Sequence, residues 1–128
     1  MAMQPELRVA VIAAGERWPE GNLRPAVEDQ WGAGSVLQLL RADGWSAISP
    51  EANTVADTFC AVARDLATAL YDCARGRELI SIGYVDDVET ATQLDSSSVV
   101  PRLQHGAFTS TLYRCGIPDC RILRLLVW

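Results

Sequence analysis

The chain contains no lysine, because all 11 of its basic residues are arginines. A Schiff base requires a lysine amine, and the phosphate-binding loop of P-loop proteins requires a lysine ammonium, so both chemistries are excluded. Basic runs are also missing, and the formal net charge is -5. A phosphate backbone attracts the opposite charge pattern, so nucleic acid is not an expected partner.

Histidine is nearly absent, and the cysteines are not paired in sequence. The single histidine is His105, and Cys60, Cys73, Cys115 and Cys120 form no CxxC motif. Structural zinc sites depend on such closely spaced ligands, so reduced structural thiols are the prediction. No nucleophile-elbow sequence accompanies His105, and a histidine before a glycine is more simply a turn residue than part of a hydrolase triad.

Long apolar runs are missing as well. No stretch approaches the roughly 20 apolar residues of a membrane span, and the first residues, MAMQPELR, carry an acid and a proline where a signal peptide has an apolar core. We therefore expect a cytoplasmic protein with no membrane partner. The 128 residues, 49% of them hydrophobic, are enough for one folded domain.

What the chain does contain is a short apolar run followed by helical patterns. Residues 7–14 are almost continuously apolar and rich in Val and Ile, which predicts a central strand covered on both faces and hence an α/β fold. A helix is predicted over residues 25–41, with Pro25 in its first turn. Gly32 and Gly34 would let its apolar face approach the sheet closely.

Further helices are predicted downstream. Ser49-Pro50-Glu51 is a helix start with a serine cap, and apolar residues continue at helical spacing as far as Cys73. Gly76 would break this helix. A short helical turn over residues 77–82, a helix over 85–94 and an extended segment over 99–101 would follow.

The residues from Val9 to Gly34 carry the pattern most typical of a functional site. A strand would end at Gly15, and the next helix would open with the adjacent acids Glu28 and Asp29. The N-terminus of a helix offers unpaired N–H groups and a positive dipole to an anion or a metal-bound ligand. Gly15 would let backbone N–H groups approach an anion.

The charged residues of this segment have two interpretations each. Glu28 and Asp29 could supply carboxylates to Mg²⁺, which needs only one or two and keeps water, or they could simply complement the helix dipole by ~0.3–1 kcal/mol each. Glu16 could hold the metal or position a water, or it could be a loop acid paired with Arg17 or Arg24. Arg17 and Arg24 could bind a phosphate or sulfonate through their planar forks, or simply be surface residues.

Three segments, in the same order along the chain, resemble one known family. They are residues 11–34 (VIAAGERWPEGNLRPAVEDQWGAG), 75–94 (RGRELISIGYVDDVETATQL) and 99–106 (VVPRLQHG). Together they are similar to the C-terminal half of the 2-phosphosulfolactate phosphatases, Mg²⁺-dependent enzymes associated with coenzyme M biosynthesis. In the first segment Gly15, Glu28, Asp29, Ala33 and Gly34 stand at the matching places.

The resemblance implies a three-layer α/β/α fold with a mixed sheet, incomplete relative to the family's full domain. It implies a Mg²⁺-dependent phosphatase that hydrolyses a small phosphorylated 2-hydroxy acid. Glu28 and Asp29 would be metal ligands and, with Glu16, catalytic residues. The substrate-binding residues would be Gly15, Arg17 and Arg77.

The family's N-terminal half has no counterpart in the sequence. Residues 1–109 are therefore interpreted as the C-terminal portion of the phosphatase domain, and residues 110–128 as a divergent apolar tail. Such a chain could form a homo-oligomer or pair with the missing half. The alternative is a non-catalytic α/β fragment or subunit that acts through association with a partner chain.

Overall fold

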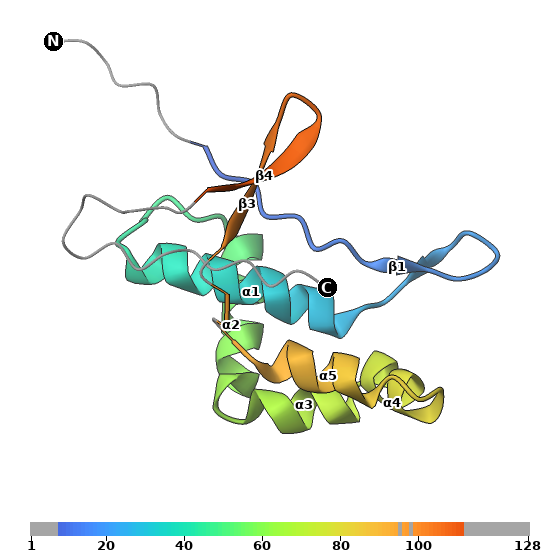
Figure 1. Ribbon diagram of the computed structural model, residues 1–128. Coiled ribbons are helices and arrows are strands. Elements are labelled where there is room, and N and C mark those ends of the chain that lie inside the picture. Colours follow the sequence, from blue (N-terminus) through green and yellow to red (C-terminus); the bar gives the residue numbers. More distant parts are fainter. Residues whose placement is uncertain (1–7, 95, 98, 112–128) are drawn as a thin grey trace, which may run out of the picture.

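The computed structural model describes residues 8–94, 96–97 and 99–111. In chain order its elements are β1 (Glu16–Arg17), β2 (Leu23–Arg24), α1 (Val27–Ala42), α2 (Pro50–Val62), the 3₁₀ turn η1 (Ala63–Asp65), α3 (Leu66–Asp72), α4 (Ala74–Ser81), α5 (Val85–Thr92), β3 (Val100–Gln104) and β4 (Ala107–Thr111). Helices and small antiparallel sheets thus form a mixed α/β structure. Helices α3, α4 and α5 group on one side of α1, and both hairpins extend from the helices (Figure 1).

The predicted central strand over residues 7–14 is wrong for the part that the structure describes. Residues 8–14 form no strand, and Val9 and Ile12 are 49% and 85% exposed. The strands that do form pair only within their own hairpins, β1 with β2 and β3 with β4. The apolar run therefore has no strand beside it among the described residues, and those residues do not build the predicted three-layer mixed sheet.

Helix α1 confirms the helix predicted over residues 25–41, but its neighbour differs from the expected one. A Cβ built on Gly34 would lie 2.5 Å from the carbonyl oxygen of Val55 and 2.8 Å from Cβ of Phe59, both in α2. Gly34 is therefore a close-contact glycine, as predicted, between two helices and not between a helix and a sheet.

The start of α2 is as predicted, whereas the chain beyond it is more broken. Ser49 caps the helix by accepting the backbone N–H of Ala52 at 3.2 Å. The expected single helix to Cys73 is instead divided by η1 into α2 and α3. Gly76 lies inside α4 and does not end a helix. The position needs a glycine because a Cβ there would collide with the carbonyl oxygen of Leu70.

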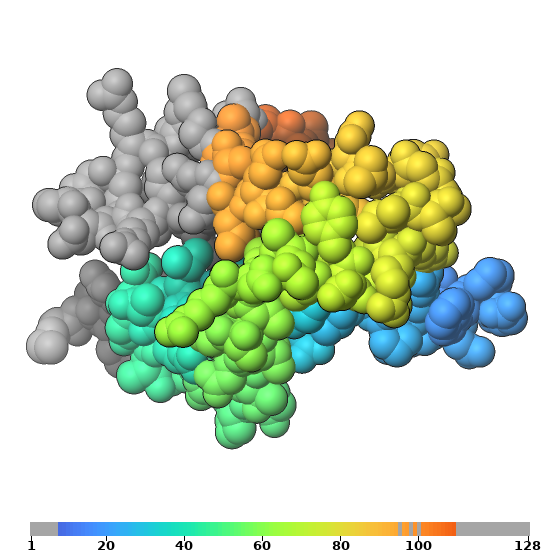
Figure 2. All heavy atoms as spheres, turned by 90° about the horizontal axis from the view of Figure 1, so that it is seen from below, coloured from blue at the N-terminus to red at the C-terminus, as the bar shows by residue number. Residues whose placement is uncertain are grey.

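The buried core lies where α3 and α5 meet. Leu66, Leu70 and Val88 form its centre, and each contributes about 1.5–3 kcal/mol by leaving water. Partly buried side chains from α1, α2 and α4 surround them, among them Trp31, Phe59 and Leu79. Figure 2 shows α3, α4 and α5 lying over α1 on this face of the molecule.

The C-terminal hairpin confirms two sequence predictions. β3 begins at Val100, within the extended segment expected over residues 99–101, and His105 and Gly106 form the turn with φ values of 50° and 81°. Positive φ at both central residues is typical of a two-residue hairpin turn, so His105 is a turn residue. Most of the predicted tail, residues 112–128, lies outside the described residues. Within the described part of the chain, no helix is long and apolar enough to span a membrane.

Candidate functional site

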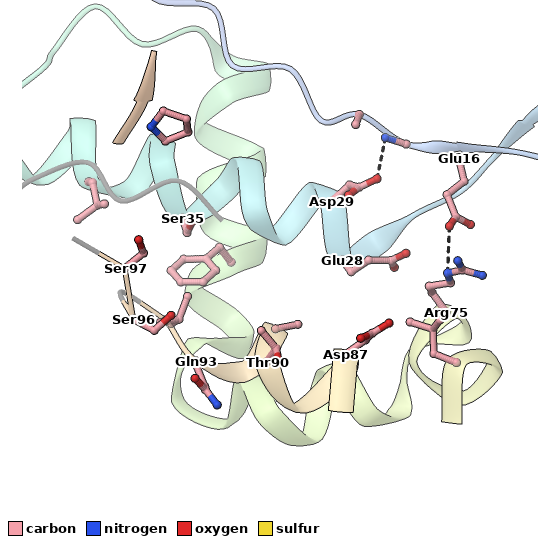
Figure 3. Close-up of a pocket in the computed structure, with 18 of the residues that line it drawn as sticks. Glu16, Glu28, Asp29, Ser35, Arg75, Asp87, Thr90, Gln93, Ser96 and Ser97 are labelled. Atoms are coloured by element: carbon pink, nitrogen blue, oxygen red, sulfur yellow. Dashed lines mark hydrogen bonds and ion pairs between the residues drawn. The ribbon is translucent and has the colours of Figure 1, made fainter. Parts of the chain in front are cut away.

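A cavity of about 1060 Å³ lies beside α1 and collects residues from both ends of the described chain. The loop at 14–16 and helix α1 line it on one side, and α4 and α5 line it on the other (Figure 3). Ser96, Ser97, Val99 and Pro101 also contribute to the lining. Charged and loop residues gather at one end, which we call the charged end: Gly15, Glu16, Glu28, Asp29, Arg75 and Asp87. The other end is lined by uncharged polar residues, including Ser35, Gln93, Ser96 and Ser97.

The first turn of α1 fixes the loop that leads into the cavity. The backbone N–H of Gly15 donates a 2.7 Å hydrogen bond to Oδ2 of Asp29. Gly15 has a φ of 68°, in the left-handed region that glycine adopts without strain. Its N–H is thus directed at a carboxylate in this structure, and not at an open anion position as the sequence suggested.

Glu28 is 6% exposed. Burial raises the pKa of its carboxyl, and the nearby charges of Asp29 and Glu16 raise it further. Oε2 of Glu28 lies 3.9 Å from Sγ of Cys73, a thiol whose pKa is also raised by burial. Cys73 and Cys60, the cysteines in the described part of the chain, are both free thiols. The two adjacent acids therefore have different environments: Asp29 holds the loop, and Glu28 is buried against the start of α4.

Glu16 belongs to a closed ring of alternating charges, which we call the charge ring. Glu16 contacts Arg24 Nη1 at 3.2 Å and Arg75 Nε at 3.0 Å. Glu78 contacts Arg24 Nη2 at 2.6 Å and Arg75 Nη1 at 3.0 Å. Both arginines lower the pKa of Glu78 by hydrogen bonding to its carboxylate. The charge ring ties the β1–β2 hairpin to α4 across 54 residues of sequence.

The remaining predicted residues lie elsewhere. Arg17 is exposed and donates to the carbonyl oxygen of Gly21 at 2.8 Å within its own hairpin. Arg77 is exposed on α4. Neither is among the residues that line the cavity, so their substrate-binding roles stay predictions. Sequence reasoning missed Arg75, whose only local signal is an acid one helical turn later, Glu78.

The donor set decides which kind of metal the cavity suits. Among the described residues, no group of three or more His, Cys, Asp or Glu side chains is arranged to hold a metal ion. Glu28 and Asp29 both reach the cavity, and Asp29 has one oxygen beyond the one that Gly15 binds. This set fits Mg²⁺, which binds through one or two carboxylates and completes its shell with water and phosphate oxygens.

A cavity with a few polar groups gathered at one end is the kind of place where small molecules bind, so this cavity is the candidate site. A family model described as 2-phosphosulpholactate phosphatase matches residues 1–106 of the chain. The protein therefore belongs to the 2-phosphosulfolactate phosphatase family, which confirms the resemblance. No solved structure gives a significant match to the chain.

Proposed function

We propose that this protein is a cytoplasmic, Mg²⁺-dependent phosphatase that hydrolyses a small phosphorylated 2-hydroxy acid such as 2-phosphosulfolactate. The observation that carries the proposal is the charged end of the cavity. Every one of its six residues, from Gly15 to Asp87, falls within the segment that the family model matches. Because the chain belongs to a phosphatase family and these six residues line one cavity, this end is the best candidate for phosphate-ester chemistry.

Glu28 and Asp29 would hold the ion, Asp29 through its Oδ1 atom because Gly15 binds Oδ2. A Mg²⁺ ion held there would supply positive charge to neutralise and orient the oxygens of a phosphoryl group. The N–H of Gly15 fixes the rotamer of Asp29, so the carboxylate of Asp29 is already in position before substrate arrives.

Glu28 is the better proton acceptor at the charged end. Glu28 forms no ion pair with an arginine among the described residues, so one of its oxygens could take a proton from an attacking water while the other holds the ion. Glu16 is less suited to this role, because both of its oxygens already contact arginines. We therefore assign proton transfer to Glu28 and a holding role to Glu16.

Phosphate release tests the proposal. Purified protein with 2-phosphosulfolactate or 2-phosphoglycerate should release inorganic phosphate in the presence of Mg²⁺, and EDTA should lower the rate about 100-fold or more. Adding excess Mg²⁺ should restore it. Asp57→Asn is a matched control, because Asp57 pairs with Arg41 away from the cavity lining. A chain that releases no phosphate with Mg²⁺, or releases it equally in EDTA, would contradict the proposal.

A second candidate function is that of a non-catalytic subunit. It is favoured by large apolar side chains that the described residues leave exposed, such as Ile12 at 85%, Leu103 at 65% and Phe108 at 75%. Leu103 and Phe108 are cross-strand partners in the β3–β4 hairpin, so they form one patch. Self-association without phosphate release would favour this candidate over the phosphatase.

A further inference from the structure

The charged end of the cavity is rich in negative charge. Glu16, Glu28, Asp29 and Asp87 line it, and Arg75 is the sole cationic side chain lining the cavity among the residues that the structure describes. A phosphorylated acid would bring further negative charge into this end. Arg75 is therefore the protein group best placed to attract an anionic oxygen there.

Arg75 is held by two of its three guanidinium nitrogens. Nε lies 3.0 Å from Glu16 Oε1, and Nη1 lies 3.0 Å from Glu78 Oε2. No acceptor within the described part of the chain takes a hydrogen bond from Nη2. The side chain is 32% exposed, and Arg75 is among the residues that line the cavity.

From this geometry we propose that Arg75 binds an anionic oxygen of the substrate through Nη2, and that Glu16 and Glu78 orient its guanidinium for this purpose. The class of anion, a phosphorylated 2-hydroxy acid, rests on the proposed function. The anion-binding role of Arg75 rests on the cavity and on the charge ring. Because the ring already orders the long side chain, binding costs less side-chain entropy than it would with a free surface arginine.

Arg24 provides the matched comparison. It contacts the same two carboxylates, Glu16 and Glu78, and so contributes equally to closing the charge ring. It does not line the cavity; its side chain is 15% exposed and its guanidinium lies 4.7 Å from the ring centre of Trp18. Loss of Arg24 thus disturbs the ring without removing the cation from the cavity.

The experiment compares Arg75→Gln, Arg75→Lys and Arg24→Gln with the parent chain. Binding of inorganic phosphate is measured by isothermal titration calorimetry with Mg²⁺ present, KM and kcat by phosphate release from 2-phosphosulfolactate, and Tm by thermal denaturation. Arg75→Gln should raise the Kd for phosphate and KM about 10- to 100-fold, as expected for a lost hydrogen bond to a charged group. Arg24→Gln should lower Tm about as much as Arg75→Gln does, whereas the Kd for phosphate should change less than about threefold.

Several outcomes would overturn this role for Arg75. One is an unchanged Kd and KM in Arg75→Gln; another is an equal loss in Arg75→Gln and Arg24→Gln, which would mean that only the ring matters. If Arg75→Gln does not fold, Arg75→Lys decides, because it keeps the charge but not the fork: weakened phosphate binding supports the role and parent-like binding contradicts it. Arg75-dependent phosphate binding without any turnover would support the role while removing the proposed function. Turnover with an unchanged KM in Arg75→Gln would do the reverse.

Discussion

Replacing Gly34 with alanine is expected to lower the free energy of unfolding by about 1–3 kcal/mol. The new Cβ would lie 2.5 Å from the carbonyl oxygen of Val55 and 2.8 Å from Cβ of Phe59. A carbonyl oxygen is present in every residue, and a Cβ is present in every residue except glycine. Shortening the side chains of α2 to alanine therefore cannot relieve the clash. The two helices would have to separate, and Phe59, which lines the cavity, would move with α2.

The sign of this effect distinguishes packing from helix propensity. Alanine is favoured over glycine within a helix by roughly 0.5–1 kcal/mol, so Gly34→Ala would stabilise the protein if α1 and α2 were not in close contact. The neighbouring change Ala33→Gly measures the propensity contribution in the same helix. Urea denaturation followed by circular dichroism gives both values. A Gly34→Ala variant more stable than the parent chain would contradict the helix contact.

Local signals in the sequence were sufficient to place α1 and the start of α2, but not the breaks between the later helices. Ser49 and Pro50 predicted the start of α2 because a cap and a fixed φ act within one turn of chain. Gly34 was correctly predicted to lie at a close contact, but the sequence could not show what it contacts. A small residue marks a face that comes close to something, and only the tertiary structure decides whether that is a sheet or a second helix.

The error over residues 7–14 has a different cause. An apolar run shows that a segment can be buried, whereas a strand also needs hydrogen-bonding neighbours at its edges. Ile12 is apolar and so could be buried, but no strand among the described residues lies beside it to form hydrogen bonds, and its side chain is exposed. The presence of a strand partner is a property of the whole chain fold and is not encoded in the run itself.

The residues of the candidate site were likewise predicted only in part. Gly15, Glu16, Glu28 and Asp29 were predicted together and do lie together, because one loop and one helix turn connect them. Arg75 lies 46 residues beyond Asp29, and the resemblance directed attention to Arg77 instead. Two residues apart on a helix means roughly 200° of rotation, so only one of these two arginines can face the cavity. The structure places Arg75 there.

Removing the carboxylate of Asp29 is expected to have the largest effect on activity. Asp29→Ala should lower kcat/KM for phosphate release about 100-fold or more, because it removes both a proposed metal ligand and the acceptor of the Gly15 N–H. It should also lower Tm, since the loop loses its hydrogen bond to α1. Steady-state kinetics and thermal denaturation measure the two effects separately.

Asp29→Asn separates charge from positioning. An asparagine keeps an oxygen that can accept the Gly15 N–H, so Tm should stay near that of the parent chain, but it provides no negative charge for a cation. We therefore expect Asp29→Asn to be nearly as inactive as Asp29→Ala. Glu51→Gln removes an acid from the first turn of α2, outside the cavity lining, and controls for the helix-dipole contribution of ~0.3–1 kcal/mol. Near-normal activity in Asp29→Asn would show that Asp29 only holds the loop, and the metal would then have to be assigned to other residues.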